Sequence, residues 1–312
     1  MYFSTKKGTI EYRDQERVER KTMNFKKIGV IGGGTMGQGI AEMLAAKGLD
    51  VMLVEKTPEK LEYSYGMIET SLDKQLEKWG ITLAEKKLIL SRIQKVTHFA
   101  ELSACDMVIE TITEDLEAKK QVFAQLDQVC PSNIILASNT SSLSLTELAS
   151  STMYPERVIG MHFIHPVSKV DLVEIIRGLK TSENTFAETK RFVEEVVEKK
   201  GIMVYESPGF VSSRMICLLI NEALHLLQEG VASAEDIDDA MRIGYSFQYG
   251  PLEMADRFGL DSVLAALERM FREFGELKYR PSIVIKKMVR AGHLGVKTGE
   301  GFFKYDKDGD RI

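Results

Sequence analysis

Short apolar segments alternate with longer amphipathic ones from position 27 to about position 205. Between Asn184 and Lys199, for example, apolar residues recur at helical spacing. Other segments are rich in β-branched residues and have the near-continuous hydrophobicity of buried strands: Ile28–Ile31, Val51–Glu55, Met107–Glu110, Ile134–Ser138, Val158–Phe163, Leu172–Ile176 and Ile202–Tyr205. Such strands, separated by helices, predict a mostly parallel sheet that is covered on both faces.

The apolar period becomes helical after the segment Ser207–Gly209. Three signals mark helix boundaries there: a capping-box-like sequence at Ser233–Asp236, a break at Gly250–Pro251 and an N-cap at Asp261. We therefore expect an α/β domain over residues 24–205 and a smaller, all-helical domain over residues 206–312. The helical domain has many apolar faces for its size, which favours burial of some of them against a second subunit.

Composition agrees with a folded two-domain protein and narrows its partners. The chain has 312 residues, of which 44% are hydrophobic and 28% are charged, so a large core can form. Lys and Arg number 41 against 46 Asp and Glu, and the formal net charge is −5. This balance disfavours a general nucleic-acid binder or a protein of anionic membrane surfaces. No apolar segment approaches the roughly 20 residues of a membrane-spanning helix.

The cysteines and the first residues favour the cytoplasm. Cys105, Cys130 and Cys217 are widely spaced and odd in number, so they build neither a disulfide framework nor a paired metal motif. Residues 1–23 are rich in charge and lack the apolar core of a secretory signal. We interpret them as a flexible N-terminal extension or the product of an upstream start codon, because Met23 stands directly before the first predicted strand.

A glycine-rich turn joins the first predicted strand to a helix. Gly32, Gly34 and Gly37 have the spacing GxGxxG. In a Rossmann-type fold the first glycine permits the tight turn, the second lets the backbone approach a pyrophosphate, and the third allows close helix packing. Glu55 ends the second predicted strand, near the spacing at which an acid binds the ribose hydroxyls. Since a carboxylate repels a 2′-phosphate, we predict binding of NAD rather than NADP.

Oxidation of an alcohol by NAD also releases a proton, which requires a base that titrates near neutral pH. His162 and His165 lie at the end of a predicted strand, where doubly wound sheets place ligands. Glu174 lies in the next strand-like segment, and a short connection through Pro166 would fold the two segments together. A carboxylate beside an imidazole selects its tautomer and stabilises the imidazolium. Taken alone, either histidine more often has a structural role. A metal site would lack a fourth ligand, so we predict none.

Two polar segments carry weaker signals. Ser138–Leu143 follows a strand end and brings hydroxyls and amides to the same sheet edge, although by itself it is typical of a polar turn and helix N-cap. Ser71, Lys74 and Lys78 share one face of a predicted helix, where cations could meet phosphates. A solvated charged face explains this second pattern equally well.

From about Lys26 to Tyr305 the chain resembles the L-3-hydroxyacyl-CoA dehydrogenase family, including its bacterial 3-hydroxybutyryl-CoA members. The matching motifs, in order, are the glycine turn with Met36-Gly37, Ser138–Leu143, His162-Phe163, Leu172–Glu174, Pro208–Val211, Gly250-Pro251, Gly259–Asp261 and Lys297–Phe302. The resemblance implies a nucleotide-binding domain followed by a helical, dimer-forming domain. It also implies reversible NAD-dependent oxidation of an L-3-hydroxyacyl-CoA, with a short acyl chain favoured.

The resemblance also implies roles for individual residues. His162 is similar to the family's general base, Glu174 to the carboxylate that orients it, and Ser141 to the hydroxyl that holds the substrate oxygen near the nicotinamide. The family's cofactor-contacting positions correspond to Gly32, Gly34, Met36, Gly37, Glu55, Glu114, Lys119 and Ser141. Its region for the CoA nucleotide corresponds to Ser71 and Lys78.

Two positions depart from the family pattern. His165 replaces the asparagine of His-Phe-Phe-Asn-Pro, and Ser213 replaces an asparagine that helps bind the substrate's oxygen or thioester. The shorter Ser213 would act through a water, or it indicates a different acyl chain or substrate. His165 is either a hydrogen-bonded loop residue or a second titrating group beside His162. Two alternatives stay open: a dehydrogenase of a free hydroxy acid or another alcohol, and an NAD-binding structural protein without catalysis.

Overall fold

The computed structural model describes residues 23–312. The strands are β1 (Lys27–Ile31), β2 (Asp50–Val54), β3 (Ile93–Val96), β4 (Met107–Glu110), β5 (Ile135–Ser138), β6 (Val158–Phe163), β7 (Leu172–Arg177) and β8 (Lys200–Tyr205). The α-helices are α1 (Thr35–Ala46), α2 (Pro58–Glu77), α3 (Leu83–Ser91), α4 (Leu116–Val129), α5 (Leu145–Ala149), α6 (Glu183–Arg191), α7 (Ser212–Glu229), α8 (Ala234–Gly244), α9 (Pro251–Phe258), α10 (Leu260–Phe274) and α11 (Ile283–Arg290).

The predicted N-terminal extension lies outside the described residues except for its last residue. That residue, Met23, is packed against α6, because its amide donates to Glu188 Oε2 at 3.2 Å. Its carbonyl oxygen accepts from the Arg191 guanidinium. Met23 is therefore attached to the sheet domain by two hydrogen bonds to α6.

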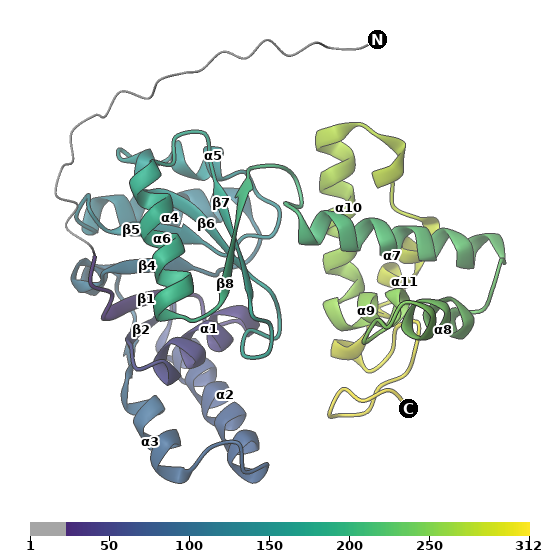
Figure 1. Cartoon of the computed structure of the whole chain (residues 1–312), viewed down its shortest axis with the longest axis horizontal. Coiled ribbons are helices and arrows are strands. Elements are labelled where there is room, and N and C mark those ends of the chain that lie inside the picture. Colours follow the sequence, from purple (N-terminus) through teal and green to yellow (C-terminus); the bar gives the residue numbers. More distant parts are fainter. Residues whose placement is uncertain (1–22) are drawn as a thin grey trace, which may run out of the picture.

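The strands form one eight-stranded sheet in the order β3-β2-β1-β4-β5-β6-β7-β8 (Figure 1). Neighbouring strands are parallel except β6 and β7, which are antiparallel. This confirms the predicted mostly parallel sheet. The sequence analysis missed β3 at one edge of the sheet. Ile93 and Val96 are buried there while the two residues between them are exposed, so this strand lacks the continuous apolar run of a central one.

Helices cover both faces of the sheet. On one face, Ile40 and Leu44 of α1 and Ile68 of α2 are buried against strand residues. On the other face, Phe123 and Leu126 of α4 are buried in a second cluster. Because both faces are covered, successive strand residues of either orientation must be apolar. This double burial is the physical origin of the apolar runs in the sequence.

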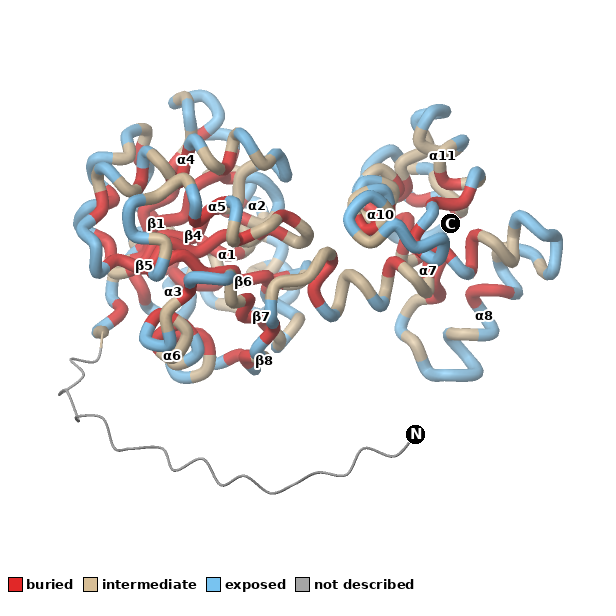
Figure 2. The backbone as a smooth tube through the Cα atoms, turned by 90° about the horizontal axis from the view of Figure 1, so that it is seen from above, coloured by how far each residue is buried: buried red, intermediate tan, exposed pale blue. Residues whose placement is uncertain are grey.

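The segment from α7 onward folds into a separate helical body with its own core. Ile220 and Leu224 of α7, Leu267 of α10 and Tyr279 are fully buried in it. Figure 2 shows buried backbone inside each of the two bodies, and Figure 1 shows them joined by the segment that leads from β8 into α7. The expected α/β domain followed by a helical domain is therefore confirmed as a fold class.

The helix boundaries in this body agree with the sequence at Ser233 and at Gly250–Pro251, where α9 begins, and differ at Asp261. The Ser233 hydroxyl accepts the amide of Asp236 at 3.1 Å and caps α8, as the sequence predicts. The prediction that Asp261 is an N-cap is wrong. Gly259 precedes α10, and Asp261 lies in the first turn, where its Oδ2 accepts from Lys297 Nζ at 2.6 Å. Since α10 already begins at Leu260, Asp261 is a helical residue, and its side chain pairs with Lys297 instead of capping the helix.

Among the described residues, no helix combines the length and apolar character needed to cross a membrane.

Candidate active site

The glycine turn between β1 and α1 has an open side. Gly32 has a φ of +93°, which favours glycine. A Cβ on Gly37 would overlap the carbonyl oxygen of Gly32, whereas a Cβ on Gly34 would meet nothing within 4 Å. Gly34 precedes α1 without a side-chain cap, and the first turn of α1 has no acidic residue. The first amides of α1 are therefore available to an anion such as a pyrophosphate.

A cleft of about 650 Å³ adjoins this turn. Its walls combine the turn, one carboxylate and apolar side chains, and its lining includes Gly32, Gly34, Glu55, Lys56, Lys60, Phe99, Ile112 and Val122. Glu55 Oε1 accepts the amide of Gly33 at 2.7 Å, so the carboxylate lies beside the turn. A helix N-terminus for phosphate, a carboxylate for ribose and an apolar wall for adenine fit a dinucleotide such as NAD.

A second predicted group gathers where β4 and β5 end. Glu114 Oε1 accepts from Thr140 Oγ1 at 2.6 Å, from the Ser141 amide at 3.1 Å and from Ser142 Oγ at 3.0 Å. Lys119 Nζ lies 3.6 Å from the other oxygen of this carboxylate. Loss of solvent raises the pKa of Glu114, but Lys119 and these donors outweigh it and hold the pKa below its usual value. The structure thus brings Glu114, Lys119 and Ser141 together.

Glu110, at the end of β4, is a charged residue of this group that the sequence analysis missed. Its Oε1 lies 2.7 Å from Lys119 Nζ, and its Oε2 accepts from Ser138 Oγ at 2.7 Å. Both members of the ion pair are buried, and burial raises the pKa of Glu110 even though Lys119 opposes the shift. The pair anchors Lys119 beside Glu114. The available signal was an acidic residue closing the otherwise apolar strand Met107–Glu110.

His162 and Glu174 meet across the antiparallel strands β6 and β7. They are directly opposite in register, and His162 Nδ1 lies 2.7 Å from Glu174 Oε2. Glu174 is fully buried and His162 is 8% exposed. Phe210 covers the imidazole with a ring-centroid distance of 5.8 Å. In a neutral imidazole whose Nδ1–H donates to this carboxylate, Nε2 carries no proton, which is the form a general base requires.

The N-terminus of α7 completes the surroundings of Glu174. The amides of Val211 and Ser212 donate to Glu174 Oε1 at 3.2 and 2.8 Å, and Ser212 Oγ donates to Oε2 at 2.8 Å. Burial raises the pKa of Glu174, but the donors on His162 and Ser212 hold it below its usual value. The sequence analysis missed Ser212, because a contact across 38 positions leaves no local pattern. The pair thus lies at the junction of the two domains.

The two departures from the family pattern each lie close in sequence to a residue of this site, His165 after His162 and Ser213 after Ser212. Ser213 follows Ser212 in the first turn of α7 and is half-buried, and His165 is exposed in the connection between β6 and β7. Within residues 23–312, no group of three or more His, Cys, Asp or Glu side chains is arranged to hold a metal ion.

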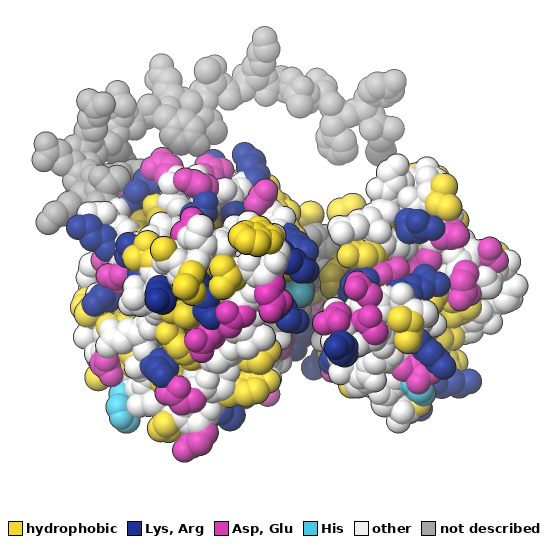
Figure 3. Space-filling model, turned by 90° about the horizontal axis from the view of Figure 1, so that it is seen from below, with side chains coloured by type: hydrophobic (Ala, Val, Ile, Leu, Met, Phe, Trp, Pro, Cys, Tyr) yellow, Lys and Arg dark blue, Asp and Glu magenta, His cyan; other side chains and the backbone are white. Residues whose placement is uncertain are grey.

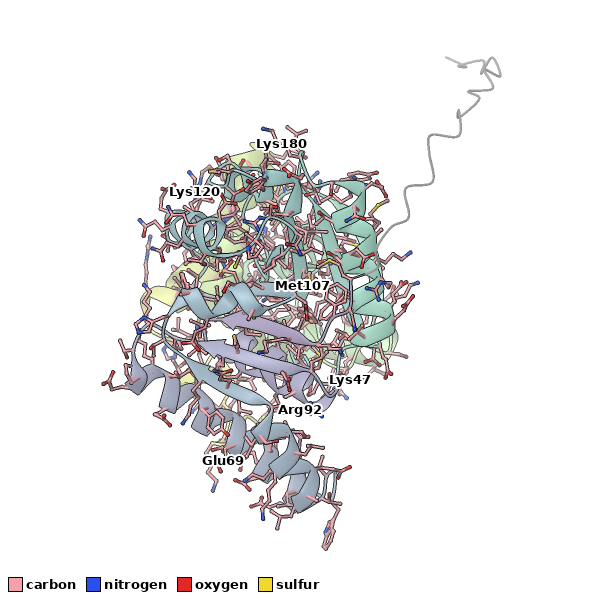
Figure 4. All side chains as sticks on the ribbon, turned by 90° about the vertical axis from the view of Figure 1, so that its left-hand side faces the viewer. Lys47, Glu69, Arg92, Met107, Lys120 and Lys180 are labelled. Carbon is pink, nitrogen blue, oxygen red and sulfur yellow. The ribbon has the colours of Figure 1, made fainter. Side chains whose placement is uncertain are left out.

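The residues predicted to meet a CoA nucleotide lie on the helical hairpin of α2 and α3. Figure 4 shows this hairpin, with Glu69 labelled on α2, extending beyond the edge of the sheet. Ser71 and Lys74 belong to the last two turns of α2, and Lys78 directly follows its end. Both lysines are exposed.

A larger cleft of about 1010 Å³ lies between the domains. Side chains from both domains line it, among them Glu114, Ser142, Tyr205, Arg269 and Arg272. His162 and Glu174 are not on its walls. Figure 3 shows the surface deeply indented between the two bodies, with charged side chains on both sides. The cleft gives ligands access to the edge of the sheet where Glu114 lies.

A dinucleotide turn, a histidine braced by a carboxylate and a helical second domain define an NAD-dependent dehydrogenase of the two-domain type. Residues 27–207 match the family described as 3-hydroxyacyl-CoA dehydrogenase, NAD binding domain, and residues 209–305 match its C-terminal domain. The chain therefore belongs to the 3-hydroxyacyl-CoA dehydrogenase family.

Relatives within this family match the chain almost from end to end. The 3-hydroxybutyryl-CoA dehydrogenase of Clostridioides difficile is 44% identical over 281 residues, covering 90% of this chain and 100% of the relative. The crystal structure of (S)-3-hydroxybutyryl-CoA dehydrogenase PaaH1 from Ralstonia eutropha is 43% identical, has a TM-score of 0.85, and covers 91% of this chain and 100% of that one. M. tuberculosis FadB2 is 35% identical with a TM-score of 0.89, covering 90% and 99%.

Proposed function

We propose that this protein reversibly oxidises an L-3-hydroxyacyl-CoA to the 3-oxoacyl-CoA with NAD, and that its substrate is short, such as 3-hydroxybutyryl-CoA. The observation that carries the proposal is the buried contact of 2.7 Å between His162 Nδ1 and Glu174 Oε2. Because β1, β4, β5 and β6 are parallel, this contact lies at the sheet edge that also bears the glycine turn. Family membership supports the reaction. The relatives named 3-hydroxybutyryl-CoA dehydrogenase, at 42% to 44% identity, support the short chain.

His162 is the proposed general base. Its Nε2 accepts the proton of the substrate's 3-hydroxyl, and the resulting imidazolium is stabilised by the Glu174 carboxylate at Nδ1. In the reverse direction the same imidazolium returns the proton to the 3-oxo group. General acid–base catalysis of this kind contributes about 10²- to 10⁴-fold in rate.

NAD is proposed to be held by the glycine turn and by Met36, Glu55, Glu114, Lys119 and Ser141. When bound, NAD supplies the nicotinamide that accepts the hydride from C3. The α1 N-terminus provides amides for its phosphates, and the Glu55 carboxylate provides acceptors for ribose hydroxyls. Glu114 positions the loop of Ser141 through its hydrogen bonds with Thr140, Ser141 and Ser142.

Substrate binding is proposed to use two sites. The hydroxyls of Ser141 and Ser213 hold the reacting oxygen or the thioester, and Ser71 and Lys78 receive the CoA nucleotide. The exposed Lys78 ammonium suits a phosphate. The free energy gained by binding the CoA nucleotide then helps to position C3 of the acyl group, although C3 lies far from the nucleotide.

We also propose a cytoplasmic homodimer. The helical domain carries exposed large apolar side chains that a second copy would cover: Met215, Val231, Ile243, Tyr245, Leu277 and Ile283. Cys105, Cys130 and Cys217 are free thiols, which suits a reducing compartment.

The decisive test is steady-state NADH consumption with 3-oxoacyl-CoA esters of graded length. We expect the highest kcat/KM with acetoacetyl-CoA. His162→Gln should lower kcat by about 10²- to 10⁴-fold while NADH binding, followed by fluorescence, is retained. His293→Gln serves as a control, because His293 lies far along the chain and pairs with Glu300. Unchanged turnover of His162→Gln would reject the base assignment.

The replacement of two family asparagines by His165 and Ser213 favours a second candidate, a dehydrogenase of a free hydroxy acid or another alcohol. Turnover of CoA esters should exceed that of the free acids if the first proposal holds. Faster turnover of a free acid would support the second candidate. Tight NADH binding without turnover of any oxoacyl thioester would indicate a structural NAD-binding protein.

A further inference from the structure

One oxygen of Glu174 accepts two hydrogen bonds from opposite domains. His162 Nδ1 lies 2.7 Å from Oε2, and Ser212 Oγ donates to the same oxygen at 2.8 Å. The other oxygen, Oε1, is occupied by the amides of Val211 and Ser212. Ser212 therefore competes directly with the imidazole for the electron density of Oε2.

The position of Ser212 on α7 holds its hydroxyl against Glu174. Ser212 is the first residue of the 18-residue helix α7, and its amide contacts Oε1 at 2.8 Å while its hydroxyl contacts Oε2 at 2.8 Å. Its two donors thus straddle the carboxylate. The α7 N-terminus adds positive electrostatic potential at the same carboxylate. Burial alone would raise the pKa of Glu174, and the hydroxyl of Ser212 contributes to holding it low.

Other charged or titratable groups on the surrounding elements have their own partners or lie apart from the carboxylate. These groups are His165 after β6, Arg177 on β7, Lys200 on β8, Arg214 on α7 and the Glu110–Lys119 pair behind β5. Arg177 and Lys200 pair with other glutamates, and Arg214 Nε donates to the Tyr279 hydroxyl at 2.7 Å. His165 is exposed to solvent. Ser212 and the two α7 amides are therefore the donors that act on Glu174 besides His162.

We propose that Ser212 is a positioning residue that sets, through Glu174, how strongly His162 holds a proton. The inference rests on the proposed role of His162 as the general base. By sharing Oε2, the Ser212 hydroxyl weakens the bond between carboxylate and imidazolium, so the imidazolium releases its proton more readily. Loss of the hydroxyl leaves Oε2 to the imidazole alone and strengthens that bond.

The sign of the effect is the same in both reaction directions. Oxidation needs the neutral imidazole, so a more strongly held proton moves the acidic limb of the kcat/KM profile to higher pH. Reduction needs the imidazolium, so its alkaline limb also moves to higher pH. A purely structural loss would lower the rate at all pH values without this common displacement.

Ser212→Val and Ser212→Thr form a matched pair, because valine and threonine have nearly the same shape and only threonine keeps a hydroxyl. We expect Ser212→Val to displace both limbs upward by about 0.5 pH unit or more, and Ser212→Thr to retain the parent profile. Valine is preferred to alanine as the replacement, because in Ser212→Ala a water molecule could occupy the space of the lost hydroxyl, whereas valine fills that space. Identical profiles for Ser212→Val and Ser212→Thr would overturn the proposal.

A direct measurement separates this inference from the proposed function. The imidazole titration of His162 is followed by NMR in the free protein, with the resonance assigned by its absence in His162→Gln. A higher titration midpoint in Ser212→Val than in Ser212→Thr supports the role of Ser212 whether or not the protein turns over 3-oxoacyl-CoA. Equal midpoints overturn it. Thermal unfolding of both variants verifies that each remains folded.

Discussion

The proposed catalytic pair of His162 and Glu174 depends on the shielding of both side chains from water. In water, the interaction free energy between an imidazole and a carboxylate is small. In this buried site, where His162 Nδ1 lies 2.7 Å from Glu174 Oε2, the carboxylate selects one tautomer and stabilises the charged ring. Burial raises the pKa of Glu174, but His162 and then the amide of Ser212 on α7 hold this pKa below its usual value. The reactivity of one side chain thus depends on donors from the second domain.

Replacement of Glu174 by glutamine tests this dependence. The amide group of glutamine donates to Nδ1 in its favoured orientation, which places the ring proton on Nε2 and removes the base. We expect kcat to fall by about 10²-fold or more, with NADH binding and thermal stability measured as controls. A variant as fast as the parent would remove Glu174 from the mechanism.

Substitution of Glu55 tests the predicted preference for NAD over NADP. In Glu55→Ala the carboxylate that repels a 2′-phosphate is absent, while Lys56 and Lys60 remain on the cleft wall. We expect the ratio of kcat/KM for NADH over NADPH to fall by about 10-fold, equivalent to ~1.4 kcal/mol. Glu62→Ala is the control, because Glu62 pairs with Lys95 outside the cleft. An unchanged ratio in Glu55→Ala would refute the ribose role.

Among the elements, the β1–α1 unit is the most constrained by backbone contact. The helix approaches the turn so closely that any side chain on Gly37 would enter the space of the Gly32 carbonyl and of Thr111. The third glycine of the motif therefore serves packing, and its effect on the cofactor is indirect. The same close approach directs the α1 amides at the cleft.

Gly37→Ala should separate these contributions. We expect a loss of about 1–3 kcal/mol in the free energy of unfolding from overpacking, together with weaker NADH binding. Gly66→Ala is the matched control, since a Cβ there meets nothing within 4 Å. That substitution lies inside α2 and should stabilise the protein by about 0.5–1 kcal/mol. Urea unfolding and NADH titration of both variants provide the comparison. An unaffected Gly37→Ala would contradict the close packing.

At the scale of the whole molecule, two bodies with separate cores meet at a short connection (Figures 1 and 2). Gly209 and Phe210 have positive φ values of 76° and 50° in this connection. The turn leads directly into α7, whose first residue contacts Glu174. The relative placement of the domains therefore determines the surroundings of His162 and Glu174.

The proposed homodimer is tested by light scattering after size exclusion. We expect a mass of twice 35.1 kDa. Ile243→Arg, on the helical domain, should weaken association by charging an apolar contact, whereas Met153→Arg, on the sheet domain, should not. Both parent side chains are exposed in the single chain, at 68% and 77%. A monomeric parent would exclude the dimer.

The sequence by itself determined the layered α/β fold, because burial of both sheet faces imposes apolar runs. It also determined the glycine turn, because the left-handed backbone there and the close approach of α1 to the turn require glycine. It also indicated the meeting of His162 and Glu174, since 12 positions with a proline between them suit a return strand. Tertiary structure alone decided the edge strand β3, the buried Glu110–Lys119 pair, the ion pair of Asp261 and the contact of Ser212 with Glu174. These features depend on which segments pack together in three dimensions, and such packing leaves no periodic signal in the chain.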